Sequence, residues 1–212
     1  MRHLTFRFLP ILAALGLLAL SASAVAGTDG QWKFIDEDDG IHTWMLEIPG
    51  QDLPGFRGQT VIKSSAKGVL DNMLNWKEHT KWMYRCAEST LLEKIDDESA
   101  FLYNRTSAPW PVWDRDVVVK SLVERTPDYS AIKVSFKNVD YAKKPVQDKV
   151  IRMPKLVGFY KLWQIEPNKT KVLYQVEPDI GGSIPKWLAK RAARDLPYTT
   201  LLKLRERVEG KK

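Results

Sequence analysis

The feature that most limits what this chain can fold into is a series of strand-like runs followed by one long amphipathic segment. Residues 130–139 show the strand pattern clearly, because Ile132, Val134 and Phe136 alternate there with polar residues. Such alternation predicts an antiparallel strand with one buried face and one solvated face. Turn residues separate similar runs, and we expect about nine strands, over residues 32–35, 41–48, 56–62, 84–95, 100–107, 116–125, 130–139, 156–166 and 171–177.

Helical spacing is confined to two regions of the chain. Apolar residues three and four apart predict a helix over residues 66–75, with a second short helix over 76–83. The C-terminal helix is predicted to begin at Ile184 and to reach about Val208, with Ser183 as its N-cap. Pro185 suits the first turn, whereas Pro197 predicts a kink or a break.

These elements predict an α+β fold in which a curved antiparallel sheet wraps around the long C-terminal helix. One helix is too narrow to cover a whole face of so long a sheet. We therefore expect an internal hydrophobic cavity or tunnel between the sheet and the helix. Neither a linker nor a repeat interrupts residues 27–212, which we interpret as one domain.

The N-terminal 26 residues have the pattern of a secretory signal peptide. Basic residues precede an uncharged apolar run over residues 8–20, and Ala24-Val25-Ala26 provides a small-residue cleavage site. The apolar run is shorter than the ~18–20 residues that span a bilayer. We therefore predict an exported protein, periplasmic or otherwise secreted. Cleavage removes two arginines, so the basic excess of +7 in the full chain becomes milder.

Motifs for catalysis, metal binding and nucleic-acid binding are missing from the sequence. His42 and His79 are far apart, without metal-ligand spacing, and Cys86 has no neighbouring histidine. No nucleophile elbow, phosphate-binding loop or dinucleotide fingerprint is present. Predicted export also argues against nucleic acid as a partner. We expect a non-enzymatic monomer without a cofactor or metal.

Two motifs resemble those of START (StAR-related lipid transfer) domains. Residues 108–116, Ala-Pro-Trp-Pro-Val-Trp-Asp-Arg-Asp, are similar to the P-[WF]-P-x-x-x-R-D segment of the family. Residues 178–188, Pro-Asp-Ile-Gly-Gly-Ser-Ile-Pro-Lys-Trp-Leu, resemble the segment that leads into the family's last helix. Residues 158–165 and 170–176 resemble its penultimate strand pair. The order and spacing of these motifs point to an exported START domain of the phosphatidylcholine-transfer-protein-like type.

The resemblance implies a helix-grip fold, with a lipid-sized tunnel between a curved sheet and the C-terminal helix. It also implies that the 108–116 loop and this helix form the tunnel mouth. The candidate lipid-binding or gate residues are Trp110, Trp113, Arg115, Ile184, Trp187 and Leu188, and Trp82 and Arg105 are further candidates for the tunnel wall. Lys186, Lys190 and Arg194, spaced four residues apart, are candidates for contact with a membrane.

Each of these assignments has an alternative that the sequence leaves open. Trp110 and Trp113 either meet the headgroup region of a membrane or pack under their loop as core residues. The basic stripe either faces anionic lipid or is only a solvated helix face. For Arg115 we favour an ion pair with Asp116 that holds the loop, over a contact with a ligand. Residues Ile184, Trp187 and Leu188 suit a core as well as a tunnel wall.

The leading functional hypothesis is binding, with transfer, of one lipid molecule such as a phospholipid, a sterol or a similar amphiphile. Removing a lipid from a bilayer exposes apolar surface at a cost of ~0.8 kcal/mol per CH₂ group, which an apolar tunnel can offset. The expected partners are therefore a lipid and, transiently, a membrane surface. Two alternatives remain at this stage: a cyclase or hydrolase that uses the same cavity, and a small-molecule sensor module.

Overall fold

The computed structural model describes residues 31–51 and 53–210. The predicted signal peptide, residues 1–26, lies outside this part of the chain. The ten strands that it contains are β1 (Lys33–Asp38), β2 (Ile41–Leu46), β3 (Gly55–Ile62), β4 (Cys86–Lys94), β5 (Ser99–Thr106), β6 (Asp114–Arg125), β7 (Ala131–Asn138), β8 (Val150–Arg152), β9 (Lys155–Glu166) and β10 (Lys169–Asp179). The helices are α1 (Ala66–Met73), the 3₁₀ turn η1 (Trp76–Glu78), α2 (His79–Trp82) and α3 (Lys186–Val208).

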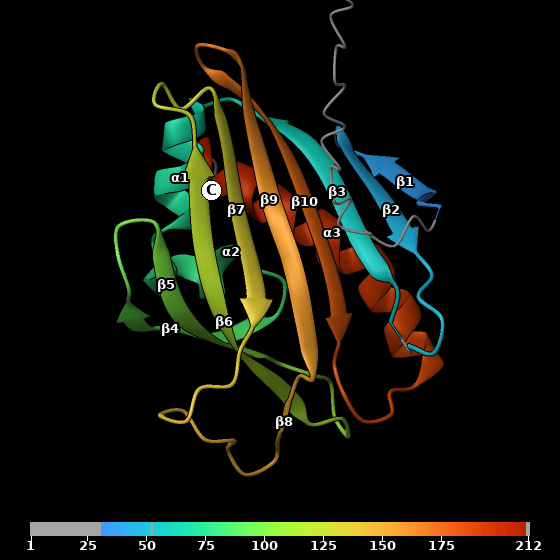
Figure 1. The fold of residues 1–212 in the computed structure, drawn as a ribbon. Coiled ribbons are helices and arrows are strands. Elements are labelled where there is room, and N and C mark those ends of the chain that lie inside the picture. The colour runs from blue at the N-terminus through green and yellow to red at the C-terminus, as the bar shows by residue number, and fades with distance from the viewer. Residues whose placement is uncertain (1–30, 52, 211–212) are drawn as a thin grey trace, which may run out of the picture.

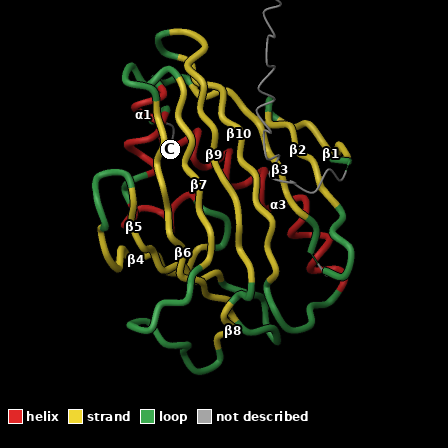
Figure 2. Tube along the Cα trace, viewed as in Figure 1, coloured by secondary structure: helices red, strands yellow, loops and turns green. Residues whose placement is uncertain are grey.

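The strands form one open sheet in the order β1-β2-β3-β10-β9-β7-β6-β5-β4. All neighbours along this path are antiparallel, while β8 pairs in parallel with the beginning of β6. Figure 1 shows the sheet twisting in front of α3, which runs behind it from β3 towards α1, with α2 behind the β6 side. Figure 2 shows the same view with all three helices on one side of the strands. The fold is the α+β arrangement predicted from the sequence, an antiparallel sheet with a C-terminal helix.

Helix α3 packs mainly against β3 and β2 and touches α1 and α2. The contact with β3 is close because Gly58 has no side chain. A Cβ atom there would lie 2.7 Å from Leu201 Cδ1 and 3.2 Å from Pro197 Cβ. Leu201 and Leu204 are fully buried on this side of the helix. This packing anchors the second half of α3 on the sheet.

The start and the interior of α3 each differ from the sequence prediction. Pro185, rather than Ser183, occupies the N-cap position, and the helix begins at Lys186. The helix also continues through Pro197 without a break. Proline lacks one backbone hydrogen bond, but the contact of Pro197 with the Gly58 backbone holds this turn against β3. Tertiary packing therefore overrides the local preference for a break.

The buried core lies between the sheet and the three helices. Its main cluster joins α1 and α3 to the inner faces of β3, β7, β9 and β10, and a smaller cluster lies on β5 and β6. Ser65 caps α1 by accepting a hydrogen bond from the Gly68 amide at 3.1 Å. Phe136 of β7 lies over Gly158 of β9, where a Cβ atom would be 2.5 Å from the ring. The absence of a side chain at Gly158 thus allows the Phe136 ring to lie across the inner face.

Candidate functional site

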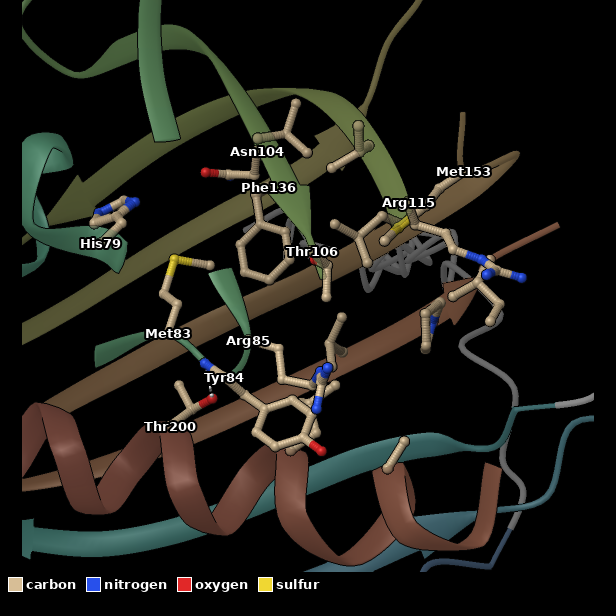
Figure 3. A pocket seen from close by; sticks show the side chains of 18 of the residues that line it. His79, Met83, Tyr84, Arg85, Asn104, Thr106, Arg115, Phe136, Met153 and Thr200 are labelled. Atoms are coloured by element: carbon tan, nitrogen blue, oxygen red, sulfur yellow. Dashed lines mark hydrogen bonds between the residues drawn. The ribbon is translucent and has the colours of Figure 1, made fainter. Parts of the chain in front are cut away.

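A cavity of about 220 Å³ lies between the inner face of the sheet and the helices. Cavities of ~150 Å³ hold one benzene molecule, and pockets for drug-sized ligands measure ~300–1,000 Å³. In this conformation the cavity therefore suits an apolar molecule of intermediate size. Figure 3 shows the cavity between the strands and α3.

One face of α3 forms a wall of the cavity. Ile184, in the turn just before the helix, lines it, as do Leu188, Ala192, Leu196 and Thr200 within α3. Their spacing of four residues places them on one side of a helix. Ile184 and Leu188 were candidates from the sequence, and Ala192, Leu196 and Thr200 continue the stripe along the helix. The Thr200 hydroxyl accepts a hydrogen bond from the Tyr84 amide at 3.2 Å, which ties α3 to the segment after α2.

Alternate residues of the strands form the opposite wall. On β6 these are Arg115, Val117, Val119 and Ser121, which share one face of the strand because side chains alternate along it. The remaining strand contributions follow the same rule and are mostly apolar: Leu102, Asn104 and Thr106 of β5, Val134 and Phe136 of β7, Leu156 and Tyr160 of β9, and Tyr174, Val176 and Pro178 of β10.

His79 lies in the cavity wall as a structural group. Its Nε2 atom lies 2.7 Å from the Met73 carbonyl, which can only accept, so Nε2 carries the proton. Nδ1 then accepts a hydrogen bond from the Ser89 hydroxyl at 3.1 Å. Burial lowers the pKa of His79 and favours the neutral ring. Both ring nitrogens of His79 therefore have hydrogen-bond partners within the protein.

The predicted ion pair between Arg115 and Asp116 is wrong. Strand β6 begins at Asp114, two residues earlier than predicted, so these neighbours point to opposite faces of the sheet. The fully buried Asp116 carboxylate instead accepts two hydrogen bonds from Arg152 of β8, at 2.7 and 3.1 Å. Arg115 faces the cavity and donates to the carbonyl oxygens of Trp113 and Gly181. It thereby connects the 108–116 loop to the turn that precedes α3.

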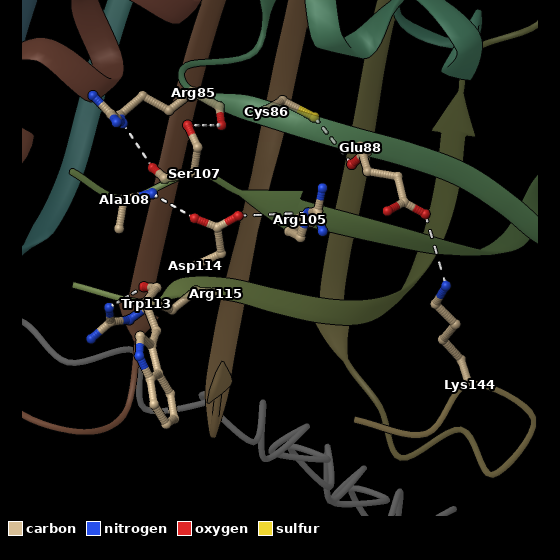
Figure 4. A network of polar contacts seen from close by, with 10 residues as sticks. All are labelled: Arg85, Cys86, Glu88, Arg105, Ser107, Ala108, Trp113, Asp114, Arg115 and Lys144. Atoms are coloured by element: carbon tan, nitrogen blue, oxygen red, sulfur yellow. Dashed lines mark hydrogen bonds and ion pairs between the residues drawn. The ribbon is translucent and has the colours of Figure 1, made fainter. Parts of the chain in front are cut away.

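Four of the candidate residues line the cavity, namely Trp82, Arg115, Ile184 and Leu188. Trp110, Trp113 and Trp187 are absent from its wall and are exposed, by 91 %, 55 % and 55 %. Arg105 also lies outside the wall and pairs with Asp114, with 3.7 Å between Nε and Oδ2 (Figure 4). Trp82 and Asn104 each bring one polar side-chain atom to the wall that lacks a hydrogen-bond partner among the described residues.

Only part of the basic stripe on α3 is described. The side chains of Lys186 and Lys190 lie outside the described part of the structure. Arg194 is exposed and its Nε atom lies 2.9 Å from Oδ1 of Asp195, which also pairs with Arg191. The hydrogen bond that Arg194 donates to Asp195 raises the pKa of Arg194. The guanidinium group of Arg194 is therefore exposed to solvent and paired with a carboxylate.

Arg85 is a cavity residue that the sequence did not single out. It is exposed yet lines the cavity, so the cavity approaches the surface at this residue. Its Nε atom donates to the Ser107 carbonyl at 2.7 Å, which joins the start of β4 to the end of β5 (Figure 4). The backbone of Arg85 has a φ of 52°, in the left-handed region. No sequence signal marks a non-glycine residue for that conformation, so this position was not predicted.

An apolar internal cavity between an antiparallel sheet and a C-terminal helix defines a class of ligand-binding domains with the helix-grip fold. Among residues 31–51 and 53–210, no cluster of side chains has the composition of a metal site. The same residues contain no helix with the length and apolar character needed to cross a bilayer. The START domain family model matches residues 17–207, and the chain belongs to this family.

Known proteins similar to this chain agree with that assignment. An uncharacterized protein of Pseudomonas aeruginosa is 36 % identical over 92 % of this chain and 98 % of its own length. The crystal structure of a STAR-related lipid transfer protein from Xanthomonas axonopodis is 32 % identical, with a TM-score of 0.74 over 84 % of this chain and 98 % of that one. Human StAR-related lipid transfer protein 5 shares the fold at 20 % identity, with a TM-score of 0.71 over 87 % of this chain and 88 % of that one.

Proposed function

We propose that this protein is a non-enzymatic lipid-binding protein that holds one lipid or similar amphiphile in its cavity. The observation that carries the proposal is the cavity itself, whose wall is mostly apolar and is formed by the inner sheet face and the helices. The similar protein from Xanthomonas axonopodis is described as a lipid transfer protein. Burial of an apolar chain against such a wall stabilises the complex by ~25 cal/mol per Å² of apolar surface buried. Binding of this kind requires no nucleophile.

The size of the cavity bears on which lipid it accepts. If six carbons of benzene occupy ~150 Å³, then 220 Å³ holds about nine carbons at the same packing. This volume suits one short acyl chain or a small ring system. A phospholipid with two long chains exceeds this volume, so its binding would require a larger cavity. The same volume also suits a short ligand. A small-molecule sensor is therefore the second candidate function.

Native mass spectrometry of protein purified from its own host tests the proposal. We expect a complex of one protein with one amphiphile, whose mass identifies the ligand after release. A short polar metabolite in its place would support the sensor function, and a protein that is empty and fails to bind fluorescent lipids would contradict both. Export is part of the same proposal and rests on residues 1–26, so the intact mass should correspond to a chain that begins at Gly27.

We further propose that the protein transfers its lipid between membranes, with Trp110 and Trp113 as the membrane contact. Both indole rings are largely exposed on the loop beside the cavity. Tryptophan partitions well into the headgroup region. Because neither ring lines the cavity, their removal should affect encounter with the bilayer and leave ligand binding unchanged.

Replacing both Trp110 and Trp113 with alanine is expected to slow lipid transfer between vesicles about tenfold or more, since each ring loses its interfacial contact. The melting temperature should change by less than ~3 °C, because exposed side chains contribute little to stability. A fluorescence assay with labelled donor vesicles measures the rate. Phe34→Ala, at an aromatic residue on β1 that is about as exposed as Trp113, is the control and should leave transfer unchanged. A large loss of stability with normal transfer would contradict the proposal.

A further inference from the structure

The permanent charges in the cavity wall are all of one sign. Arg85 and Arg115 are the only described residues in its wall with a permanent charge, and the wall contains neither a carboxylate nor a lysine. Burial favours the neutral form of His79 by lowering its pKa, and the neutral form of the wall tyrosines Tyr84, Tyr160 and Tyr174 by raising theirs. An apolar cavity of this composition presents two guanidinium groups to whatever it binds, without an internal counterion. Figure 3 shows both arginines among the side chains that surround the cavity.

Arg115 is a buried charge without a partner of opposite sign. Only 5 % of its surface is exposed to solvent. The acceptors of its two hydrogen bonds are neutral backbone carbonyls, and its Nε atom has no partner among the described residues. Burial lowers its pKa, while the nearby Asp114 opposes that shift. A buried charge usually has an ionic partner because its desolvation costs several kcal/mol.

The carboxylates near Arg115 are already engaged elsewhere. Asp114 accepts a hydrogen bond from the Ala108 amide at 3.0 Å and pairs with Arg105. Asp116 points to the other face of the sheet and is bound by Arg152. Two hydrogen bonds occupy only two of the five N–H donors of a guanidinium group. Arg115 therefore has further N–H donors, and no acidic side chain among the described residues accepts a hydrogen bond from them.

Arg85 supplies the second charge at the point where the cavity approaches solvent. Its Nε–H is held by the Ser107 carbonyl, and the Ser107 amide donates in return to the Arg85 carbonyl at 2.9 Å. These bonds fix the side chain at the rim while leaving its terminal nitrogens without an ion pair in the described structure. Guanidinium groups bind carboxylate and phosphate oxygens in a two-point geometry.

We infer that the ligand is a single-chain amphiphile with an anionic oxygen headgroup, a carboxylate or a phosphate, which Arg85 binds at the rim of the cavity while the buried Arg115 adds a second positive charge to the wall. This inference rests on the proposed function and narrows it to one class of ligand. A headgroup at the rim leaves the chain to occupy the apolar interior, where about nine carbons fit. The described wall contains no acidic side chain that could pair with the positive group of a zwitterionic or cationic headgroup.

Matched ligands of equal chain length test the inference. Nonanoic acid, nonyl phosphate and nonan-1-ol compete with a fluorescent lipid at pH 7.4, where the carboxylic acid is ionised. We expect the two anions to bind at least about tenfold more tightly than the alcohol, since hydrogen bonds to charged groups are the strong ones. The comparison of acid with phosphate then separates a fatty-acid ligand from a phosphate-bearing one.

Arginine variants show whether these side chains cause the preference. Arg85→Gln and Arg115→Gln should each reduce the ratio of anion to alcohol affinity by about fivefold or more, while nonanol affinity stays within twofold. Arg125→Gln, on the same strand as Arg115 but outside the wall, is the control and should keep the full ratio. Because Arg115 also holds backbone carbonyls, Arg85→Gln carries the test if the Arg115 variant fails to fold.

The possible failures are distinguishable. If the acid, the phosphate and the alcohol bind equally well, or if Arg85→Gln keeps the full ratio, the charge inference is overturned while lipid binding stands. If none of the three ligands displaces the fluorescent lipid and that lipid itself fails to bind, the proposed function falls as well.

Discussion

Replacing Arg152 with methionine should lower the free energy of unfolding by about 3–5 kcal/mol, because it leaves a fully buried carboxylate without its counterion. Asp116 has no exposed surface, and both its oxygens accept hydrogen bonds from Arg152. The bond to Asp116 raises the pKa of Arg152, as expected for a pair that stabilises both charges. Urea unfolding followed by fluorescence of the tryptophans measures the change.

Two companion variants make the origin of this loss clear. Adding Asp116→Asn to the Arg152→Met variant removes the unpaired charge and should recover at least half of the lost stability. Lys133→Met breaks the exposed pair with Glu124, at 3.3 Å, and should change stability by less than ~1 kcal/mol. Equal losses in the Arg152 and Lys133 variants would contradict a special role for the buried pair.

Ala192→Trp is expected to reduce lipid affinity by about a hundredfold or more while keeping or raising stability. Ala192 lies in the middle of the α3 stripe that lines the cavity. An indole ring added there occupies the space that a ligand chain needs, and filling an empty cavity contributes about 0.5–2 kcal/mol of stability. Titration with a fluorescent lipid and thermal unfolding measure the two effects.

The opposite signs of these two effects identify the cavity as the binding site. Arg191→Trp, on the exposed side of the same helix, places the same ring in solvent and should leave the affinity unchanged. Normal affinity in the Ala192 variant, with its fold intact, would show that the ligand binds elsewhere. Loss of affinity in both variants would point to a general effect on α3.

The fold was predictable where long periodic runs determined it. The nine predicted strands and the long helix are all present, since alternation and four-residue spacing are properties of the sequence alone. Strand β8 was missed because three residues carry no period, and its position depends on pairing with Asp114–Asp116 of β6. The predicted Arg115–Asp116 pair failed for a related reason. The start of β6 lies two residues before its predicted boundary, and that shift places Arg115 on the cavity face.

The cavity wall was predictable in part. Ile184 and Leu188 were apparent as apolar candidates at the start of the helical segment, but a wall and a core have the same pattern in sequence. Whether Trp110 and Trp113 are buried depended on how their loop meets the sheet, which no local signal determines. Arg85 was missed because its role arises from pairing with Ser107, 22 residues away.

The order of strands has a consequence for how the protein folds as it is made. Strand β3 pairs with β10, and Arg57 donates to Gln175 across a separation of 118 residues. Contacts this distant in sequence form slowly, because a long loop must close before they contribute any stability. The N-terminal three strands therefore cannot join the rest of the sheet until β10 has been synthesised, and α3 follows later still. Until then the apolar inner face stays open, and a chaperone that shields it during this interval would protect the chain from aggregation.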